Sequence, residues 1–204
     1  MAGSDPRVDL LRALGRPMGG SSDFDLNPGF KLPAGRVLRP AGVLIAVVMP
    51  SSSEMNGPQV VLTKRSSHLK HHPGQIAFPG GKVDAGDRDV TAAALREAHE
   101  EVGLAPEQVE VLGLLPAHQT VTGFSMSPVL AMVRGGFDPV AEAGEVDEVF
   151  LVPLRHLTDL ARYRVETRDW LGQVRRYYAV PYGPYYIWGA TARILRGLAE
   201  RMQP

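Results

Sequence analysis

The chain has 204 residues, of which 44% are apolar and 22% are charged, the balance of an ordinary globular protein. Lysine and arginine together number 22, as do aspartate and glutamate, so the net charge gives no reason to expect a nucleic-acid or membrane partner. The chain has no cysteine, which excludes disulfides, a thiolate nucleophile and a cysteine zinc site.

The first predicted element is a helix that starts at Pro6, is capped by Ser4 or Asp5, and ends at Gly15. Residues 16–40 are rich in glycine, proline and serine, which predicts a long surface connection. We therefore divide the chain into residues 1–38, a helix with an extended connection, and a main domain over residues 39–204. Residues 1–14 do not resemble a signal peptide, and no apolar run reaches the roughly 20 residues that span a bilayer, so we expect a cytoplasmic protein.

The main domain opens with two strands rich in valine, isoleucine and leucine, over residues 41–49 and 59–64, joined by a hairpin loop. Residues 71–89 have the composition of a loop, and a helix follows over about 89–102, with Gly103 as a left-handed cap. Further strands are predicted at 109–115, 126–133, 146–152 and 174–180, and helices at 153–161 and 188–202. Strands and helices that do not alternate regularly predict an α+β fold.

The helix over residues 89–102 carries three carboxylates on one side. At about 100° per residue, Glu97, Glu100 and Glu101 fall together, away from the apolar stripe of Thr91, Ala94, Leu95, Ala98 and Val102. Carboxylates at these spacings repel one another, and only Arg96 is close enough in sequence to offset them. Such a face is usually just solvated, but a hard cation such as Mg²⁺ would also resolve the repulsion.

The residues before this helix favour the functional interpretation. Phe78, Pro79, Gly80 and Gly81 supply a rigid turn and a bare backbone that can approach a phosphate or lend a carbonyl oxygen to a cation. Asp87 lies where it can orient Arg96.

The segment from Gly81 to Leu104 resembles the Nudix box, G-x5-E-x7-R-E-U-x-E-E-x-G-U, in which U is a bulky apolar residue. Asp87 replaces the first glutamate of the box, one residue is inserted before Arg96, and Ala98 is a small residue at the first U position. The other motif positions match: Gly81, Arg96, Glu97, Glu100, Glu101, Gly103 and Leu104. The resemblance implies an α/β/α sandwich around a mixed sheet, with an added N-terminal helix in this chain.

The resemblance also implies roles for the box residues in a metal-dependent hydrolase. Glu97 and Glu101 would be the main ligands of Mg²⁺ or Mn²⁺, with Glu100 as a ligand to a second metal or a partner to water. The carbonyl of Gly81 would complete the coordination sphere, and Arg96 would hold the glutamates in place.

A second motif resembles the signature of the coenzyme A diphosphatase branch of this family. It comprises residues 61–66 (VLTKRS), Lys70, and residues 74–81 (GQIAFPGG), and two later elements agree with it, IWGATA at 187–192 and the patch Gly123-Phe124 with Pro128-Val129. The resemblance implies that the substrate is coenzyme A or a coenzyme A thioester. The products would be 3′,5′-ADP and 4′-phosphopantetheine or its acyl form. A homodimer is compatible with the family.

The densest basic cluster lies close in sequence to residues 78–81, called the glycine turn below. It is a candidate receptor for the third phosphate of coenzyme A and comprises Lys64, Arg65, Lys70, His71 and His72. Phe78 and Gly80 complete the predicted substrate-binding set. For Lys64 and Arg65, a strand end in solvent is an equally good interpretation. The two histidines lack the further ligands of a zinc site, so we expect them to shape the loop.

The general base would come from Glu100 or from the acidic segment 142–148, where Glu145 or Glu148 is preferred; a solvated acidic turn is the alternative. Three rival functions remain open. The chain could be a Nudix hydrolase of ADP-ribose, NADH or a dinucleoside polyphosphate, a Nudix-fold binding module without turnover, or a purely structural domain.

Overall fold

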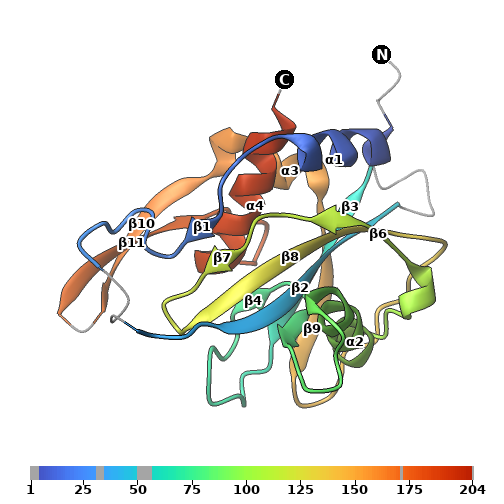
Figure 1. The fold of residues 1–204 in the computed structure, drawn as a ribbon, viewed down its shortest axis with the longest axis horizontal. Coiled ribbons are helices and arrows are strands. Elements are labelled where there is room, and N and C mark those ends of the chain that lie inside the picture. Colours follow the sequence, from blue (N-terminus) through green and yellow to red (C-terminus); the bar gives the residue numbers. More distant parts are fainter. Residues whose placement is uncertain (1–4, 31–34, 50–56, 171, 204) are drawn as a thin grey trace.

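The computed structural model describes residues 5–30, 35–49, 57–170 and 172–203. A mixed β-sheet lies between two layers of helices (Figure 1). Helices α1 (Pro6–Gly15), α3 (Leu154–Leu157) and α4 (Gly189–Met202) cover one face, and α2 (Val90–Val102) covers the other. The α/β/α sandwich and the α+β class predicted from the sequence are therefore confirmed.

The sheet is built around β2 (Arg39–Val48) and β8 (Phe124–Val133), which pair in parallel over ten residues each, from Arg39 opposite Phe124 to Val48 opposite Val133. β3 (Gln59–Arg65) pairs antiparallel with β9 (Val146–Pro153), and β6 (Val109–Leu114) pairs with β8. β1 (Ser21–Ser22) and β7 (His118–Gln119) extend the sheet beyond β8. β10 (Arg164–Trp170) and β11 (Gln173–Ala179) form a separate hairpin.

The predicted elements differ from the observed ones where the elements are short and at the seven-residue strand β10, which was not predicted. The segment 71–89 is not a continuous loop, because it contains β4 (Ile76–Ala77) and β5 (Gly80–Lys82). The predicted helix over 153–161 is instead the short α3 followed by a 3₁₀ turn over Leu160–Arg162. Most of the predicted hairpin loop 50–58 lies outside the described residues.

β4 and β5 fill the space where β2 and β3 diverge. β2 and β3 pair with each other only at Val47 opposite Val60 and Val48 opposite Gln59. Further along, β2 pairs with β5 and β3 pairs with β4. Gly80 has a φ of 147°, and a Cβ atom there would lie 2.4 Å from the carbonyl oxygen of Gly42, so only glycine fits. The glycine turn is thus placed inside the sheet.

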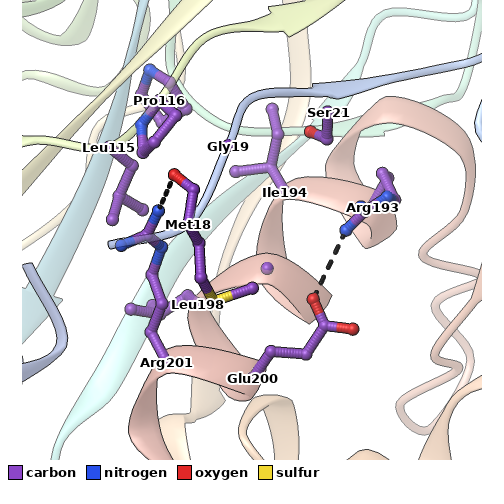
Figure 2. A pocket seen from close by; sticks show the side chains of 12 residues that line it. Met18, Gly19, Ser21, Leu115, Pro116, Arg193, Ile194, Leu198, Glu200 and Arg201 are labelled. Carbon is purple, nitrogen blue, oxygen red and sulfur yellow. Dashed lines mark hydrogen bonds and ion pairs between the residues drawn. The ribbon is translucent and has the colours of Figure 1, made fainter. Parts of the chain in front are cut away.

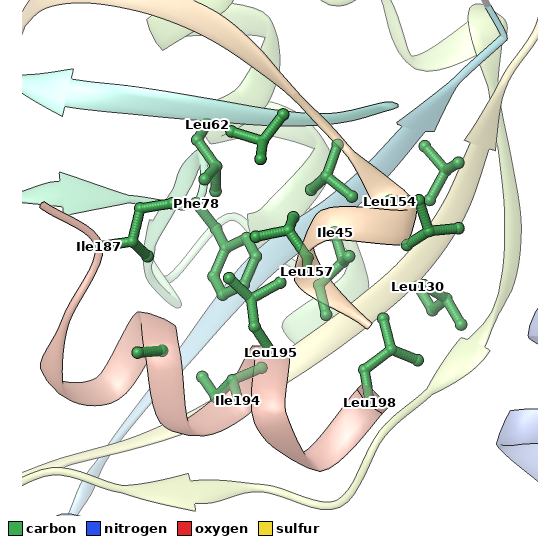
Figure 3. Packing of buried hydrophobic residues seen from close by; sticks show 14 of the residues in the cluster. Ile45, Leu62, Phe78, Leu130, Leu154, Leu157, Ile187, Ile194, Leu195 and Leu198 are labelled. Carbon is green, nitrogen blue, oxygen red and sulfur yellow. The ribbon is translucent and has the colours of Figure 1, made fainter. Parts of the chain in front are cut away.

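Alternate residues of β2 supply two cores, one on each face of the sheet. Val43, Ile45 and Val47 pack with α1, α3 and α4, whereas Leu44, Ala46 and Val48 pack with α2. Figure 3 shows the first core, in which Phe78 lies among Ile45, Leu157 and Leu195. Burial of each large apolar side chain stabilises the fold by about 1.5–3 kcal/mol, which holds the sheet and both helix layers in one body.

The described part of residues 1–38 packs against the main domain. Leu10 and Ala13 of α1 belong to the same core as α4. The buried Arg201 of α4 donates hydrogen bonds to the carbonyl oxygens of Ala13, Arg16 and Met18, and Figure 2 shows the contact to Met18 at 2.9 Å. These hydrogen bonds hold the start of the predicted surface connection, at Arg16 and Met18, against α4. No helix in the described ranges is long and apolar enough to span a membrane.

Candidate active site

Helix α2 is held close against β2, which brings its carboxylates to the glycine turn. The side chain of Asp89 caps the helix by accepting a hydrogen bond of 2.8 Å from the amide of Ala92, and Gly103 ends it in the left-handed conformation, with a φ of 73°. A Cβ atom at Gly42 would lie 2.0 Å from the carbonyl oxygen of Val90. Gly42 therefore permits the close approach of α2 to β2. The sequence analysis did not identify this role; its only signal was a glycine within an apolar strand.

Glu101 is a buried carboxylate with little compensation. Its side chain is 4% exposed, and its Oε2 accepts a hydrogen bond of 3.0 Å from the amide of Gly80. Burial, together with the charges of Glu97 and Glu145, raises the pKa of Glu101 to about 7, against the opposing effects of the Gly80 amide and Arg65. The Gly80 amide and Arg65 lower the pKa of Glu101 less than burial and the neighbouring acids raise it, which favours a cation at this position.

Glu97 converges on the same turn. Its carboxylate lies against Gly81, where a Cβ atom would be only 2.4 Å from Oε1. Burial raises the pKa of Glu97, Arg96 lowers it, and the charges of Glu100 and Glu145 raise it further. Glu97 and Glu101 are thus brought together, as the spacing predicted.

Arg96 connects the helix to the loop that precedes it. Its Nε and Nη2 atoms each donate to a different carboxylate oxygen of Asp87 at 3.0 Å, and Nη2 lies 3.1 Å from Oε1 of Glu97. The pair with Arg96 lowers the pKa of Asp87, and the same contact raises that of Arg96. Asp87 therefore orients Arg96 as predicted, despite being shorter than the glutamate of the box and one residue further away.

Glu100 departs from the predicted cluster of three carboxylates. Its side chain is 55% exposed, and its Oε2 accepts a hydrogen bond of 3.0 Å from Nη1 of Arg96. In the described part of the chain, no three acidic or histidine side chains are gathered closely enough to hold a metal ion. The donors that fit a divalent cation are the oxygens of Glu97 and Glu101, whose pKa values are raised first by burial and then by neighbouring carboxylates.

The two candidate bases in the acidic segment have different surroundings. The carbonyl oxygen of Glu145 accepts a hydrogen bond of 2.8 Å from the amide of Ser66, and its side chain is exposed. The charge of Glu145 raises the pKa of both Glu97 and Glu101. Glu148 instead accepts a hydrogen bond from the hydroxyl of Tyr185. Glu145 is thus the candidate that acts electrostatically on the acids of α2.

The predicted substrate-binding residues are not all in one place. Arg65 is half-buried, and its charge lowers the pKa of Glu101, which places it beside the acids. Lys70, His71 and His72 are exposed on the loop after β3, where His72 has a φ of 56°. Phe78 is 3% exposed and packs in the core, so its ring has no surface to offer a substrate, contrary to the prediction.

Two pockets in the described part of the chain contain none of these acids. One lies between α4 and the connection after α1 (Figure 2), and the other is lined by residues 26–30 and two side chains of β11. The candidate site is defined by its carboxylates and the glycine turn.

Comparison with known proteins identifies the family. The family profile described as the NUDIX domain matches residues 39–172. The uncharacterised Nudix hydrolase NudL of Enterobacter sp. (strain 638) is 44% identical over 161 residues, which cover 79% of this chain and 81% of the relative. NudL of Salmonella newport (strain SL254) matches with the same identity and coverage.

Two solved structures share the fold. The MutT/nudix family protein from Enterococcus faecalis superposes with a TM-score of 0.53 and 17% identity, covering 85% of this chain and 65% of that protein. The NUDIX domain of Shewanella oneidensis NrtR, complexed with ADP ribose, superposes with a TM-score of 0.50 and 16% identity, covering 87% and 93%. The chain belongs to the Nudix family and is a hydrolase that acts on phosphoric anhydrides.

Proposed function

We propose that this Nudix hydrolase cleaves the diphosphate of coenzyme A or a coenzyme A thioester, releasing 3′,5′-ADP and 4′-phosphopantetheine or its acyl form. One observation carries the proposal: three separate segments that resemble the coenzyme A diphosphatase branch meet at β4. Residues 61–66 run along β3, which pairs with β4 at Thr63 opposite Ala77 and Lys64 opposite Ile76. In the segment 187–192, the hydroxyl of Thr191 donates a hydrogen bond of 3.0 Å to the carbonyl oxygen of Ile76.

The strand β4, where these segments meet, lies close in sequence to the residues that contact the acids. Two residues separate β4 from Gly80, whose amide bonds to Glu101. The carboxylate of Glu97 lies against the next residue, Gly81. A substrate bound by the three segments would therefore have its diphosphate beside both glutamates, which supports coenzyme A recognition and cleavage at one place.

The proposed chemistry depends on Mg²⁺ or Mn²⁺ held by Glu97 and Glu101, with the Gly81 carbonyl completing the coordination sphere and Glu100 as a ligand to a second metal or a partner to water. The cation would neutralise the diphosphate and activate the attacking water. No protein nucleophile is required, because phosphoryl transfer depends mainly on positioning and charge stabilisation.

The remaining roles fall to side chains around the acids. Arg96 holds Glu97 in position, and Glu145 accepts the proton of the attacking water. Lys64, Arg65 and Lys70 bind phosphate oxygens of the substrate.

The proposal extends to the setting of the enzyme. We assign the hydrolase domain to residues 39–204, with residues 1–38 as an extension, and place the protein in the cytoplasm with small molecules as its only ligands. A homodimer is the proposed assembly, and light scattering coupled to size-exclusion chromatography would test it.

The test is a substrate panel with product identification by mass spectrometry. The protein is incubated with Mg²⁺ or Mn²⁺ and with coenzyme A, acetyl-coenzyme A, dephospho-coenzyme A, ADP-ribose or NADH. We expect 3′,5′-ADP and phosphopantetheine from coenzyme A, with turnover abolished by EDTA and by Glu101→Gln but retained in the matched surface variant Glu107→Gln.

Three outcomes would contradict parts of the proposal. Full turnover by Glu101→Gln at saturating Mg²⁺ would remove Glu101 from the metal site. Faster cleavage of ADP-ribose or NADH would keep the acids and change the substrate. Cleavage of nothing with either metal would favour a Nudix-fold binding module.

A further inference from the structure

One face of the sheet carries a line of residues that leads away from the glycine turn. The Cβ position of Gly42 points at α2, so its neighbours Ala41 and Val43 in β2 face the opposite side of the sheet, as does Arg39. Val43 belongs to the core on that side, which agrees with the alternation.

Cross-strand partners extend this line to neighbouring strands, because paired residues share a face. Gly80 pairs with Val43, Lys82 pairs with Ala41, and Phe124 pairs with Arg39. Arg39 lies four positions before Val43 in β2, about 13 Å away at the rise of an extended strand. Glu97 lies on the α2 face, against Gly81, so a ligand that extends from it to this face would cross at Gly80, whose amide bonds to Glu101. It would then pass Lys82 before it reaches Arg39.

The guanidinium of Arg39 is held by an aromatic ring, and its charge is not paired with a carboxylate of the described residues. Its guanidinium carbon lies 4.1 Å from the centre of the Phe124 ring. Arg36 lies against Gly123, the residue before Phe124, and donates a hydrogen bond of 3.4 Å to the carbonyl oxygen of Val121. Across the described residues, neither arginine nor Lys82 forms an ion pair with a carboxylate. A stacked guanidinium keeps its in-plane N–H groups available for two-pronged contact with a phosphate.

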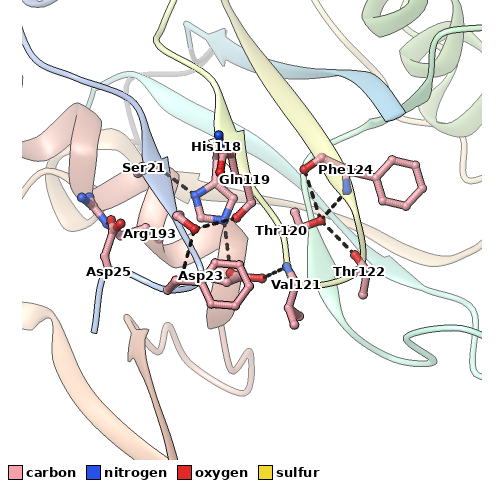
Figure 4. A network of polar contacts seen from close by, with 12 residues as sticks. Ser21, Asp23, Asp25, His118, Gln119, Thr120, Val121, Thr122, Phe124 and Arg193 are labelled. Carbon is pink, nitrogen blue, oxygen red and sulfur yellow. Dashed lines mark hydrogen bonds and ion pairs between the residues drawn. The ribbon is translucent and has the colours of Figure 1, made fainter. Parts of the chain in front are cut away.

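A polar network holds the loop that supplies Phe124 (Figure 4). The carboxylate of Asp23 accepts a hydrogen bond of 2.8 Å from the amide of Val121 and lies 3.2 Å from Nε2 of His118. His118 is fully buried, and its Nδ1 lies 2.9 Å from the hydroxyl of Ser21.

Thr120 closes the same loop from the other side. Its hydroxyl accepts a hydrogen bond of 2.9 Å from the amide of Phe124, and its own amide donates to the Phe124 carbonyl oxygen at 2.9 Å. Because both ends of the loop are held by buried polar contacts, the ring of Phe124 forms a pre-organised support for Arg39.

We propose that Arg39, with Arg36 against Gly123 and Lys82 between Arg39 and Gly80, binds the phosphomonoester of a nucleoside 3′-phosphate whose diphosphate lies at Glu97 and Glu101. This inference rests on the proposed function, since it places the extra phosphate of a coenzyme A substrate. It assigns that phosphate to the start of β2 rather than to the exposed loop that carries Lys70, His71 and His72.

The test compares two nucleotides that differ only in the 3′-phosphate. Isothermal titration calorimetry in Mg²⁺ buffer measures the affinities of 3′,5′-ADP and 5′-AMP for the wild-type protein and for Arg39→Ala. We expect the wild type to bind 3′,5′-ADP roughly tenfold more tightly, as for charge-assisted hydrogen bonds at a partly exposed site, and Arg39→Ala to bring the ratio near one.

Matched variants distinguish a phosphate site at Arg39 from one at Lys70 and from the general loss of an exposed arginine. Arg168→Ala removes an exposed arginine of the hairpin, and Lys70→Ala removes the competing cation; both should keep the preference. Arg39→Lys keeps the charge but loses the planar fork, so its ratio should fall between those of the wild type and Arg39→Ala. Thermal melting of each variant verifies that the fold is intact.

Several results would overturn the inference. They are a ratio near one in the wild type, a preference that persists in Arg39→Ala, a preference lost in Lys70→Ala, and an equal loss of both affinities in Arg39→Ala, which would indicate base stacking instead. The outcomes for the Arg39 site and for the proposed function can be distinguished. Coenzyme A turnover without a 3′-phosphate preference removes only the Arg39 site, whereas an Arg39-dependent preference without coenzyme A turnover removes only the proposed substrate.

Discussion

Replacing Glu101 by glutamine should stabilise the metal-free protein at alkaline pH while abolishing hydrolysis. The glutamine keeps an oxygen that can accept the hydrogen bond from the amide of Gly80, at the same position inside the protein. What it removes is a carboxylate that burial and neighbouring acids make difficult to ionise.

The size of the effect follows from the pKa of Glu101, which rises from 4.5 to about 7 on folding. Between these pH values the folded protein holds a proton that the unfolded chain has released, so stability falls as the pH increases. At 1.36 kcal/mol per pKa unit, the cost approaches about 3 kcal/mol above pH 7 and is absent below pH 4.5. For a chain of this length, that corresponds to a melting temperature roughly 6–12 °C higher in the variant.

The assay is urea denaturation in EDTA, followed by circular dichroism at pH 4.5 and pH 8, for the wild type, Glu101→Gln and the exposed-site control Glu107→Gln. Glu101→Gln should gain stability at pH 8 and match the wild type at pH 4.5, and the control should show no pH-dependent difference. Equal stabilities of Glu101→Gln and the wild type at both pH values would refute the reasoning, because Glu101 would then ionise in the folded protein without cost.

Two further variants test the contacts that assemble the site. Gly81→Ala should lower kcat at least roughly tenfold by displacing Glu97, whose Oε1 would lie 2.4 Å from the new Cβ, whereas Gly86→Ala in the same loop meets no atom within 4 Å and should stay near wild-type activity. Steady-state kinetics check this, and unchanged activity of Gly81→Ala with an unchanged melting temperature would contradict it. Thr191→Val should lower the free energy of unfolding by about 1–2 kcal/mol through the lost hydrogen bond to Ile76. Thr191→Ser keeps the hydroxyl and loses one buried methyl group, so it should lose less, about 0.8 kcal/mol; equal urea midpoints for the two variants would contradict the prediction.

Helix α2 could be predicted from local patterns, but the surroundings of its acids could not. Residue spacing predicted a shared side for Glu97, Glu100 and Glu101 and did not distinguish among them. The structure buries Glu101 under Gly80 and leaves Glu100 exposed on Arg96. The difference arises because β5 lies along one edge of the carboxylate face, and that position is set by strand pairing with β2.

The contact between Asp87 and Arg96 shows how a loop can offset changes in sequence. A shorter side chain and an extra residue would each be expected to weaken the contact. The amide of Asp84 donates a hydrogen bond of 2.8 Å to the carboxylate of Asp87, and the amide of Asp87 donates to the Asp84 carbonyl oxygen at 3.0 Å. This turn takes up the additional residue and delivers the carboxylate to Arg96.

Local sequence determined most of the long elements, the ends of α2, the α+β class and the presence of a Nudix box, because each depends on residues close together in the chain. Tertiary structure decided where those residues meet. The short strands show no periodicity and depend on pairing: β4, β5 and β7 pair with the longer strands β3, β2 and β8, and β1 pairs with β7. The network of Ser21, Asp23 and His118 joins residues almost one hundred positions apart. The sequence predicted Phe78 in the substrate site, but its ring packs in the core with residues of α4. The backbone two residues later, at Gly80, contacts the acids instead.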